Sequence, residues 1–556
     1  MNRLRRVINN TLISFLGQAV AWVSTLLLTI AYGRFLGAIK FGELYFAVTF
    51  VTLLGYPILS SFDKQAIRDV AQKPDKAAGY LSNLLLVRLG TWFILYTVIL
   101  VASWQLGYSP EVRVLVAICG FDLLCNAIAS SFASLHYVIE RTIFPVVGNI
   151  LEKGLSALFG ILLLKFGAGV QIMAVVIVVG SLINGIWQAA WLFRRVSANF
   201  SIDQSLIREI VRTSIPFLIN GVLVIGYASI DTVLLSLMTN YTVVGWYGAA
   251  QRLIDTMGFL PTIVITTIMY PIFSKLSIAS DADLKLAIEK SVNFLLFCGV
   301  PIATVMVVTA PNIIRFLYER NEFAQSIPVL QVAAPGVVFI FVNFALSSII
   351  LSKNQDRRLP TVSAIALVFN LGLNIILILL YQHIGAAIAS TLTEMLVCCI
   401  LITFIPRHLM PIGSLRVALK AIIASLVMAL AILPFHTLHI FGILPIAMLV
   451  YLGASVLLGT IPREDYLAVY DAIRQKARLT SSPATNHLPE TPPFHADQLL
   501  EVESADTIKL PGFQLQQVRS FPIKAIRLQQ VRSHSLAQQE KLVPVSEEGS
   551  VINIER

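Results

Sequence analysis

Charged residues are scarce in this chain of 556 residues. Asp, Glu, Lys and Arg make up 13% of it and hydrophobic residues 56%, whereas roughly 25% of an average soluble protein is charged. A soluble domain could not bury so much apolar surface, and a disordered chain has the opposite balance. The apolar residues run in long stretches without alternating with polar ones, which excludes an outer-membrane barrel. The composition therefore predicts an all-α polytopic membrane protein.

Motifs for enzyme chemistry are lacking as well. The five cysteines lie inside apolar stretches without a CxxC pair, so neither a metal site nor a disulfide framework is predicted. The sequence contains no GxxxxGK[ST], HExxH or GxSxG motif. Asp281-x-Asp283 has the form of a metal-binding pair, but it stands in a short loop, and we interpret it as part of a helix cap. We expect a protein that is not an enzyme and holds no cofactor and no metal.

Basic residues outnumber acidic ones by 41 to 31, which gives a net charge of +10. Up to residue 462, 21 of them lie in loops on the side of the N-terminus and six in the opposite loops. This asymmetry follows the positive-inside rule and indicates cytoplasmic ends rather than a nucleic-acid partner. Arg3, Arg5 and Arg6 precede an apolar stretch that is too long for the core of a signal peptide, so we interpret that stretch as the first span.

About 14 transmembrane helices are predicted, because that many stretches approach the roughly 20 apolar residues that a span needs. They cover 7–32, 43–62, 80–104, 111–137, 143–165, 170–193, 213–237, 244–271, 288–310, 327–352, 360–380, 384–405, 415–435 and 440–460. We group them as an N-terminal six-helix bundle (1–200), a second six-helix bundle (201–410) and an extra helix pair (411–462). The loop over 312–326 has room for one or two amphipathic turns.

A faint internal repeat supports this grouping. At an offset of 203 residues, Phe41-Gly42 corresponds to Val244-Gly245. Repeats of six helices keep the same orientation, so an axis along the membrane normal would relate them. Residues 463–556 have a different composition, rich in Pro, Ser and Gln, and are predicted to be a cytoplasmic, largely disordered tail in which the hexapeptide LQQVRS occurs twice.

Ionisable residues inside spans are costly and are therefore functional candidates by default. Glu152 and Lys153 are adjacent, so their side chains leave the helix about 100° apart; we expect that they cannot pair face to face and that each needs another partner. Arg252 and Asp255 share a helix face. Either they form an internal salt bridge, or Arg252 faces the lumen, where its planar guanidinium suits an anionic phosphate while Asp255 holds it. The cavity candidates for substrate binding are Arg252, Asp255, Arg88, Lys153, Glu152 and Asn149. The candidates for ion coupling are Asp231, Asp122 and Glu394.

Several stretches carry a family resemblance. They are Tyr32-Gly-Arg-Phe-Leu-Gly37 with Phe41-Gly42-x-x-Tyr45, Ser214-Ile-Pro-Phe217, Val244-Gly-Trp-Tyr247-x-Ala-Ala-Gln-Arg-Leu253, and Leu317-Tyr318 with Phe323 and Leu330. In their order and spacing they resemble the polysaccharide flippase branch of the multidrug/oligosaccharidyl-lipid/polysaccharide exporter superfamily. The similarity covers about residues 1–460 and leaves out the tail.

The resemblance implies two six-helix bundles that face each other across a central cavity in the cell membrane. By alternating access they would carry a polyprenyl-pyrophosphate-linked oligosaccharide to the outer leaflet for surface polysaccharide biosynthesis. The implied partners are this lipid-linked oligosaccharide, membrane lipids and polysaccharide polymerase or assembly proteins. Arg252-Leu253 followed by Asp255 looks like the counterpart of a functional Arg in the relative that flips the peptidoglycan precursor, lipid II. That relative has lumenal arginines in its first span, where Gln18 and Trp22 stand here.

Three other functions stay open at this stage. A cation-coupled drug antiporter of the same superfamily would depend on buried acids such as Asp122 and Asp231. A lipid II flippase is disfavoured by the first span. A membrane polymerase or ligase typically needs a large outer loop, and the outer loops here are short.

Overall fold

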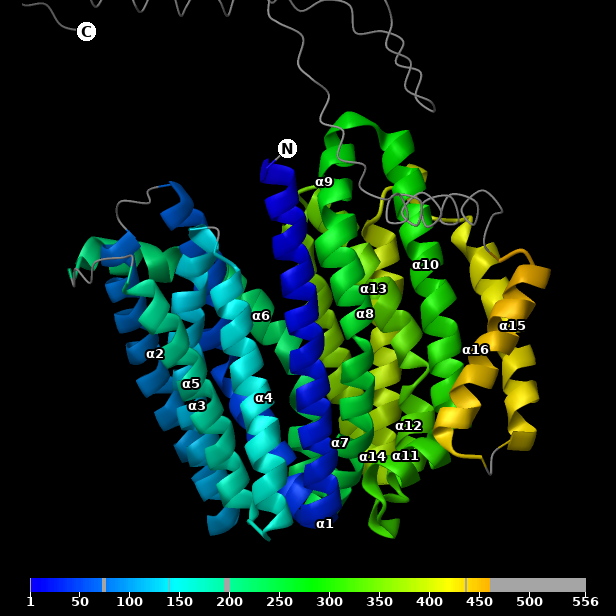
Figure 1. Ribbon diagram of the computed structural model, residues 1–556, viewed down its shortest axis with the longest axis horizontal. Helices are drawn as coiled ribbons and strands as arrows, with labels where there is room; N and C mark the ends of the chain where they lie inside the picture. Colours follow the sequence, from blue (N-terminus) through cyan, green and yellow to red (C-terminus); the bar gives the residue numbers. More distant parts are fainter. Residues whose placement is uncertain (1, 73–76, 140, 195–200, 436–437, 461–556) are drawn as a thin grey trace, which may run out of the picture. The chain divides into compact units, whose positions relative to one another are not determined.

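A computed structural model describes residues 2–72, 77–139, 141–194, 201–435 and 438–460 (Figure 1). These residues are almost entirely helical and form no strand, which confirms the predicted all-α class. The predictions for residues 463–556, both the disorder and the repeated hexapeptide, lie outside the described residues.

The described chain folds into sixteen α-helices with short π- and 3-10 segments between them. The α-helices are α1 (Asn2–Gln72), α2 (Ala77–Gln105), α3 (Pro110–Val138), α4 (Ile143–Lys165), α5 (Val170–Leu192), α6 (Gln204–Met238), α7 (Tyr241–Met257), α8 (Phe259–Ile263), α9 (Tyr270–Ala279), α10 (Asp281–Val308), α11 (Ala310–Tyr318), α12 (Ser326–Ala333), α13 (Gly336–Ser352), α14 (Leu359–Phe404), α15 (Ser414–Ile432) and α16 (Ile440–Leu457). Helix α1 packs on α3, α4, α6 and α7, and α14 packs on α6 and α13. The extra pair, α15 and α16, packs together, and α15 also contacts α10.

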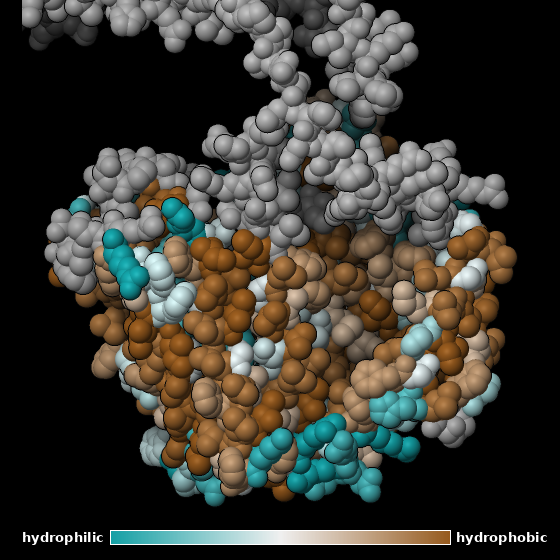
Figure 2. Space-filling view, viewed as in Figure 1, coloured by the Kyte–Doolittle hydropathy of each residue, from teal (hydrophilic) through white to brown (hydrophobic). Residues whose placement is uncertain are grey.

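Ten helices of the described chain are long and apolar enough to cross a membrane. The number is eleven if α12 and α13, which are bent by 40° relative to each other, count as one broken span. Apolar side chains cover a broad belt of the surface, and hydrophilic ones gather at one end of it (Figure 2). The chain therefore has the exterior of a multi-pass membrane protein.

Two of the predicted breaks between spans are single non-helical residues rather than loops. The stretches 7–32 and 43–62 are joined into α1 with a single non-helical residue, Gly37, whose φ of 76° lies in the region that favours glycine. Likewise 360–380 and 384–405 are joined into α14, interrupted at Gln382 with a φ of 49°. One residue with positive φ redirects a helix without a loop, so the hydropathy pattern placed the breaks but missed their form.

The predicted span 244–271 is irregular. Helix α7 ends at Met257, the short α8 follows, and Val264–Met269 forms a π-helix before α9 begins. Pro261 and Pro271 lack a backbone N–H and disturb the regular hydrogen-bond ladder, which a local π-helix can accommodate. The predicted turns in 312–326 are present as the end of α11, a 3-10 turn and the start of α12.

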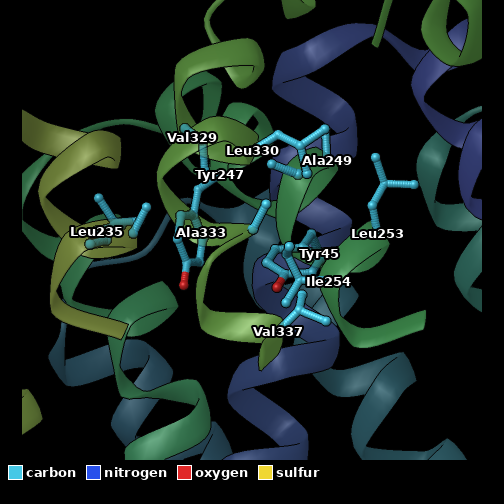
Figure 3. Packing of buried hydrophobic residues seen from close by; sticks show 14 of the residues in the cluster. Tyr45, Leu235, Tyr247, Ala249, Leu253, Ile254, Val329, Leu330, Ala333 and Val337 are labelled. Atoms are coloured by element: carbon cyan, nitrogen blue, oxygen red, sulfur yellow. The ribbon is translucent and has the colours of Figure 1, made fainter. Parts of the chain in front are cut away.

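A close backbone contact joins α1 to α7, at the residues that carry the predicted repeat. A Cβ atom on Gly42 would overlap the Tyr241 carbonyl, and one on Gly245 would overlap the Ala38 carbonyl. Ala38 and Tyr241 are separated by the same 203 residues as Gly42 and Gly245. The residue that Gly42 meets is thus the equivalent of the residue that Gly245 meets, as a two-fold relation between the halves requires. Around this contact Tyr45 and Tyr247 pack among Ile254 and other buried apolar residues (Figure 3).

Candidate functional site

The Arg252 cavity is a space of about 270 Å³ between α1, α3, α4, α5 and α7. Its charged lining residues are Asp122, Glu152, Lys153 and Arg252, and its aromatic ones are Tyr32, Phe41 and Tyr45. Four of the nine candidate residues from the sequence therefore meet in one cavity. They come from three different helices, a convergence that no spacing in the sequence reveals.

Arg252 is held by an aromatic ring rather than by an acid. Its guanidinium lies over the ring of Tyr45, 5.3 Å from the centroid, a distance typical of a cation–π contact. Among the described residues no ion pair with Asp255 is found, and Asp255 accepts a hydrogen bond from the Gln251 amide at 3.0 Å instead. Of the two alternatives for this pair, the internal salt bridge is absent, and Arg252 faces a cavity.

Glu152 and Lys153 contact each other, so the prediction that they could not pair is wrong. The flexible methylene chain of lysine lets the ammonium reach back to the carboxylate, although the two Cα–Cβ bonds diverge. The other oxygen of Glu152 accepts from the Asn184 amide at 2.7 Å, and Asn184 in turn accepts from Gln188 at 2.6 Å. A polar network therefore crosses from α4 to α5.

Asp122 lines the same cavity from α3. Its Oδ2 accepts a hydrogen bond from Asn126 at 3.0 Å, and the Asn126 amide also contacts the Ser181 hydroxyl at 3.0 Å. Its carboxylate therefore sits at the edge of a second polar chain, between α3 and α5.

The amide cavity, named for its side chains, adjoins the Arg252 cavity. It measures about 280 Å³ and shares Glu152 and Lys153 with it. The carboxamides of Gln18, Asn126, Asn149, Asn184 and Gln188 line it, together with hydroxyls of Ser14, Ser130 and Tyr137. Asn149 was a candidate from the sequence, whereas Asn184 and Gln188 were missed. Their spacing of four residues on an apolar helix was the available signal.

The Glu394 cavity, about 360 Å³, lies between α1, α6, α7, α13 and α14. Asp255 and Glu394 are its charged lining residues, with Trp22, Tyr227 and Asn370 around them. The Asn343 amide donates to Glu394 at 2.9 Å. Asp255 thus belongs to a different cavity from Arg252, and no basic side chain lines the Glu394 cavity. No cluster of three His, Cys, Asp or Glu residues in the described chain could hold a metal ion.

Asp231 and Arg88 line none of these three cavities. Asp231 is 3% exposed and accepts hydrogen bonds from the Tyr247 hydroxyl and, at 2.6 Å, from the Thr232 backbone. Arg88 is fully buried and donates to the Ala127 carbonyl and the Ser130 hydroxyl across the α2–α3 contact. Both positions are explained by packing between helices.

Helix α1 is tied to the end of α11 by a set of contacts that we call the Arg34 clasp, formed by Arg34, the carbonyls of Phe316 and Leu317, Glu319 and Glu322. Arg34 donates to the two carbonyls at 2.6 Å each and pairs with Glu319 at 2.9 Å. Glu322 accepts from the Ala38 backbone N–H at 3.2 Å, directly after the Gly37 break. The Tyr318 ring stacks on Phe323, 4.6 Å between centroids, and its hydroxyl donates to Ala249 on α7 at 3.0 Å. The segment after α10 therefore ties α1 to α7.

Comparison with known proteins agrees with this description. The family model for "polysaccharide biosynthesis protein" matches residues 7–277. The fold is similar to the lipid II flippase MurJ in an inward closed conformation, with a TM-score of 0.64 and 15% identity over 80% of this chain and 98% of that chain. It is also similar to multidrug resistance MATE family transporters of the MOP superfamily. The inward-facing form has a TM-score of 0.53 and 14% identity over 70% of this chain and 92% of that chain. The outward-facing form has a TM-score of 0.50 and 14% identity over 71% and 93%. No curated protein matches the sequence.

Proposed function

With the resemblance to the polysaccharide exporter family confirmed by a match over residues 7–277, we propose that this membrane protein is a lipid-linked oligosaccharide flippase. It moves a polyprenyl-pyrophosphate-linked repeat unit from the inner to the outer leaflet, for surface polysaccharide biosynthesis, by alternating access. Transporters, rather than enzymes, are what its fold resembles.

The position of Arg252 carries this proposal. Its guanidinium lines a cavity, lacks an acidic partner among the described residues and rests on the face of Tyr45. A guanidinium stays protonated and donates in a planar fork, which suits a phosphate group. Lys153 lines the same cavity with its charge balanced by Glu152. Arg252 is therefore the group that binds the pyrophosphate, with Lys153 beside it.

We infer fourteen crossings arranged as two six-helix bundles and an extra pair. The spans Ile13–Ile58 and Asp356–Phe404 have 46 and 49 residues. At 1.5 Å per residue each would reach roughly 70 Å, more than twice the hydrocarbon thickness of about 30 Å. Each therefore counts as two crossings, broken at Gly37 and Gln382. If α7–α9 form one span and α12–α13 another, the crossings add up to fourteen, as in the predicted bundles over 1–200 and 201–410 and the extra pair over 411–462.

In this arrangement both ends of the described chain are cytoplasmic and the protein lies in the cell (inner or plasma) membrane, as the distribution of basic residues favours. Its partners are the lipid-linked oligosaccharide and membrane lipids, together with polysaccharide polymerase or assembly proteins that use the flipped unit.

The test is a gene deletion complemented with variants, followed by mass spectrometry of polyprenyl-linked oligosaccharides in the membranes. Arg252→Ala should leave the protein inserted but let one complete repeat unit accumulate at least about tenfold over wild type, since a charged hydrogen bond contributes about 1.5–3 kcal/mol. Arg315→Ala, an arginine outside the three cavities, is the matched control. Normal export by Arg252→Ala would contradict its role.

The Glu394 cavity supports a second candidate, a cation-coupled drug antiporter. Asp255 and Glu394 give it a negative lining with aromatic rings and no basic side chain, a chemistry that suits organic cations. In the deletion strain this function would appear as sensitivity to cationic dyes without accumulated oligosaccharide, and Glu394→Gln would reproduce the sensitivity. Asp231 and Asp122 remain ion-coupling candidates under either function.

A lipid II flippase is the third candidate, and the similarity to MurJ is one of fold. Gln18 lines the amide cavity and Trp22 the Glu394 cavity, at the positions where the resemblance leads us to expect lumenal arginines. The identity of the lipid-linked unit that accumulates in the deletion strain separates the two substrates.

A further inference from the structure

The amide cavity is unusual in its chemistry. Five carboxamides and three hydroxyls line it, and its only charged lining residues, Glu152 and Lys153, contact each other. Polar groups buried inside a membrane protein are costly unless they are hydrogen-bonded. Packing alone would favour apolar residues at these positions, so the cavity calls for a ligand that uses its polar groups.

Gln188 shows where such a ligand would be held. Its side chain is 2% exposed, and its amide group donates to Asn184 at 2.6 Å. Its carbonyl oxygen Oε1 is buried and has no hydrogen-bond partner in the described chain. A buried acceptor without a donor costs about 1–3 kcal/mol. A ligand hydroxyl or N–H group in the cavity would remove this penalty.

The mixture of groups indicates the class of ligand. Carboxamides and hydroxyls each donate and accept hydrogen bonds, and so do the hydroxyl and acetamido groups of a sugar. A lining without net charge gives an anionic sugar no electrostatic attraction that would offset the loss of its hydration. The Arg252 cavity, in contrast, presents a guanidinium to an anion.

The two cavities meet at Glu152 and Lys153. A group bound against Arg252 therefore lies next to the amide cavity, with only the Glu152–Lys153 pair between them. We propose that the amide cavity binds uncharged sugar residues of the lipid-linked substrate, next to the pyrophosphate at Arg252, and thereby selects neutral or acetamido sugars over acidic ones. This inference rests on the proposed function, because it takes the pyrophosphate as the group bound by Arg252.

The experiment uses the full chain in lipid nanodiscs and three probes. These are polyprenyl pyrophosphate without sugar, the same lipid carrying a neutral N-acetylhexosamine disaccharide, and the same lipid carrying a disaccharide with a hexuronic acid. Wild type should bind the neutral glycolipid about tenfold more tightly than the other two. Gln188→Leu should reduce binding of the neutral glycolipid to the level of the sugar-free lipid and leave the sugar-free lipid unaffected.

Two further variants complete the design. Gln171→Leu changes an exposed glutamine on the same helix and should bind all three probes as wild type does. Gln188→Glu keeps the shape of the side chain and should weaken binding of the acidic glycolipid most, by repulsion.

Wild type that binds all three lipids equally, or prefers the acidic one, would overturn the glycan site while leaving the pyrophosphate site intact. Wild type that binds none of them would overturn both proposals.

Discussion

Arg252 and Asp255 stand one turn apart on α7, yet they line different cavities. A separation of three residues turns the helix by about 300°, so the two side chains diverge by about 60°. That angle is small enough for a salt bridge on an isolated helix, but here Tyr45 takes the guanidinium and Gln251 the carboxylate. The partner of Arg252 lies on α1, about 200 residues away in the sequence, whereas the partner of Asp255 lies on α7 itself.

Alanine substitutions at Arg88 and Arg252 should have opposite effects on stability and on lipid binding, because Arg88 packs between helices and Arg252 lines a cavity. Arg88→Ala removes hydrogen bonds across the α2–α3 contact and leaves a void in a fully buried site. We expect it to lower the free energy of unfolding by about 2–4 kcal/mol and to leave the affinity of the folded protein for its lipid substrate unchanged. Thermal unfolding and lipid binding, measured in the same detergent preparation, check both parts. Arg252→Ala should show the reverse pattern, and a loss of affinity in Arg88→Ala with normal stability would contradict this assignment.

At this scale the sequence predicted residue types better than contacts. Ionisable residues in apolar spans marked eight of the nine candidate sites, and six of those eight line cavities. The sequence does not predict that Arg88 is buried between helices whereas Arg252 faces a cavity, because both arginines stand in similar apolar stretches. Amides such as Gln188 escaped notice since they carry no charge.

Among the helices, the Arg34 clasp joins elements that the sequence separates by about 280 residues. It holds the Gly37 break of α1 against the end of α11 and, through Tyr318, against α7. All three elements border the contact between the two repeats. Under the proposed alternating access, we infer that α1 and α11 separate in one state, which would break the clasp at each transport cycle.

Arg34→Ala should therefore favour the state in which α1 and α11 are separated and the Arg252 cavity is more accessible. The change removes an ion pair and two hydrogen bonds from a charged donor, each of which contributes about 1.5–3 kcal/mol, enough to shift the population at least about tenfold. A single cysteine at Thr29 in the Arg252 cavity, in a chain freed of its native cysteines, reports opening through its reaction rate with a membrane-impermeant maleimide. Arg315→Ala on α11 is the control. An unchanged labelling rate in Arg34→Ala would show that the clasp does not govern opening.

The breaks inside helices mark the limit of element prediction. Hydropathy located the apolar stretches of α1 and α14 on both sides of Gly37 and Gln382. Since the connecting residues are also helical, the form of each break depends on one backbone torsion, to which hydropathy is insensitive. The clasp could not be predicted either, because it joins residues about 280 positions apart and two of its bonds go to backbone carbonyls, which carry no sequence signal.

Across the whole molecule, the contact of α1 with α7 relates the two repeats. Gly42 and Gly245 meet each other's neighbours in the same way, and Tyr45 fills the space beside Gly248, which is also 203 residues away. Repeats related in this manner enter the membrane in the same direction only if each contains an even number of crossings. Two crossings by α1, which its length indicates, therefore correspond to a two-fold axis along the membrane normal, and a single crossing to an axis in the membrane plane.

Whether α1 crosses the membrane once or twice can be tested in intact cells. If α1 crosses twice, the N-terminus lies opposite both Gln105 and Phe166, at the ends of α2 and α4, and on the same side as Asp356 after α13. Single cysteines at these exposed positions should react with an impermeant maleimide from outside at Gln105 and Phe166, and at Asp356 only after permeabilisation. A single crossing by α1 would exchange the sides of Gln105 and Phe166 relative to an N-terminal tag. In that case the repeats would be inverted, with a two-fold axis in the membrane plane, and the proposal of fourteen crossings would be wrong.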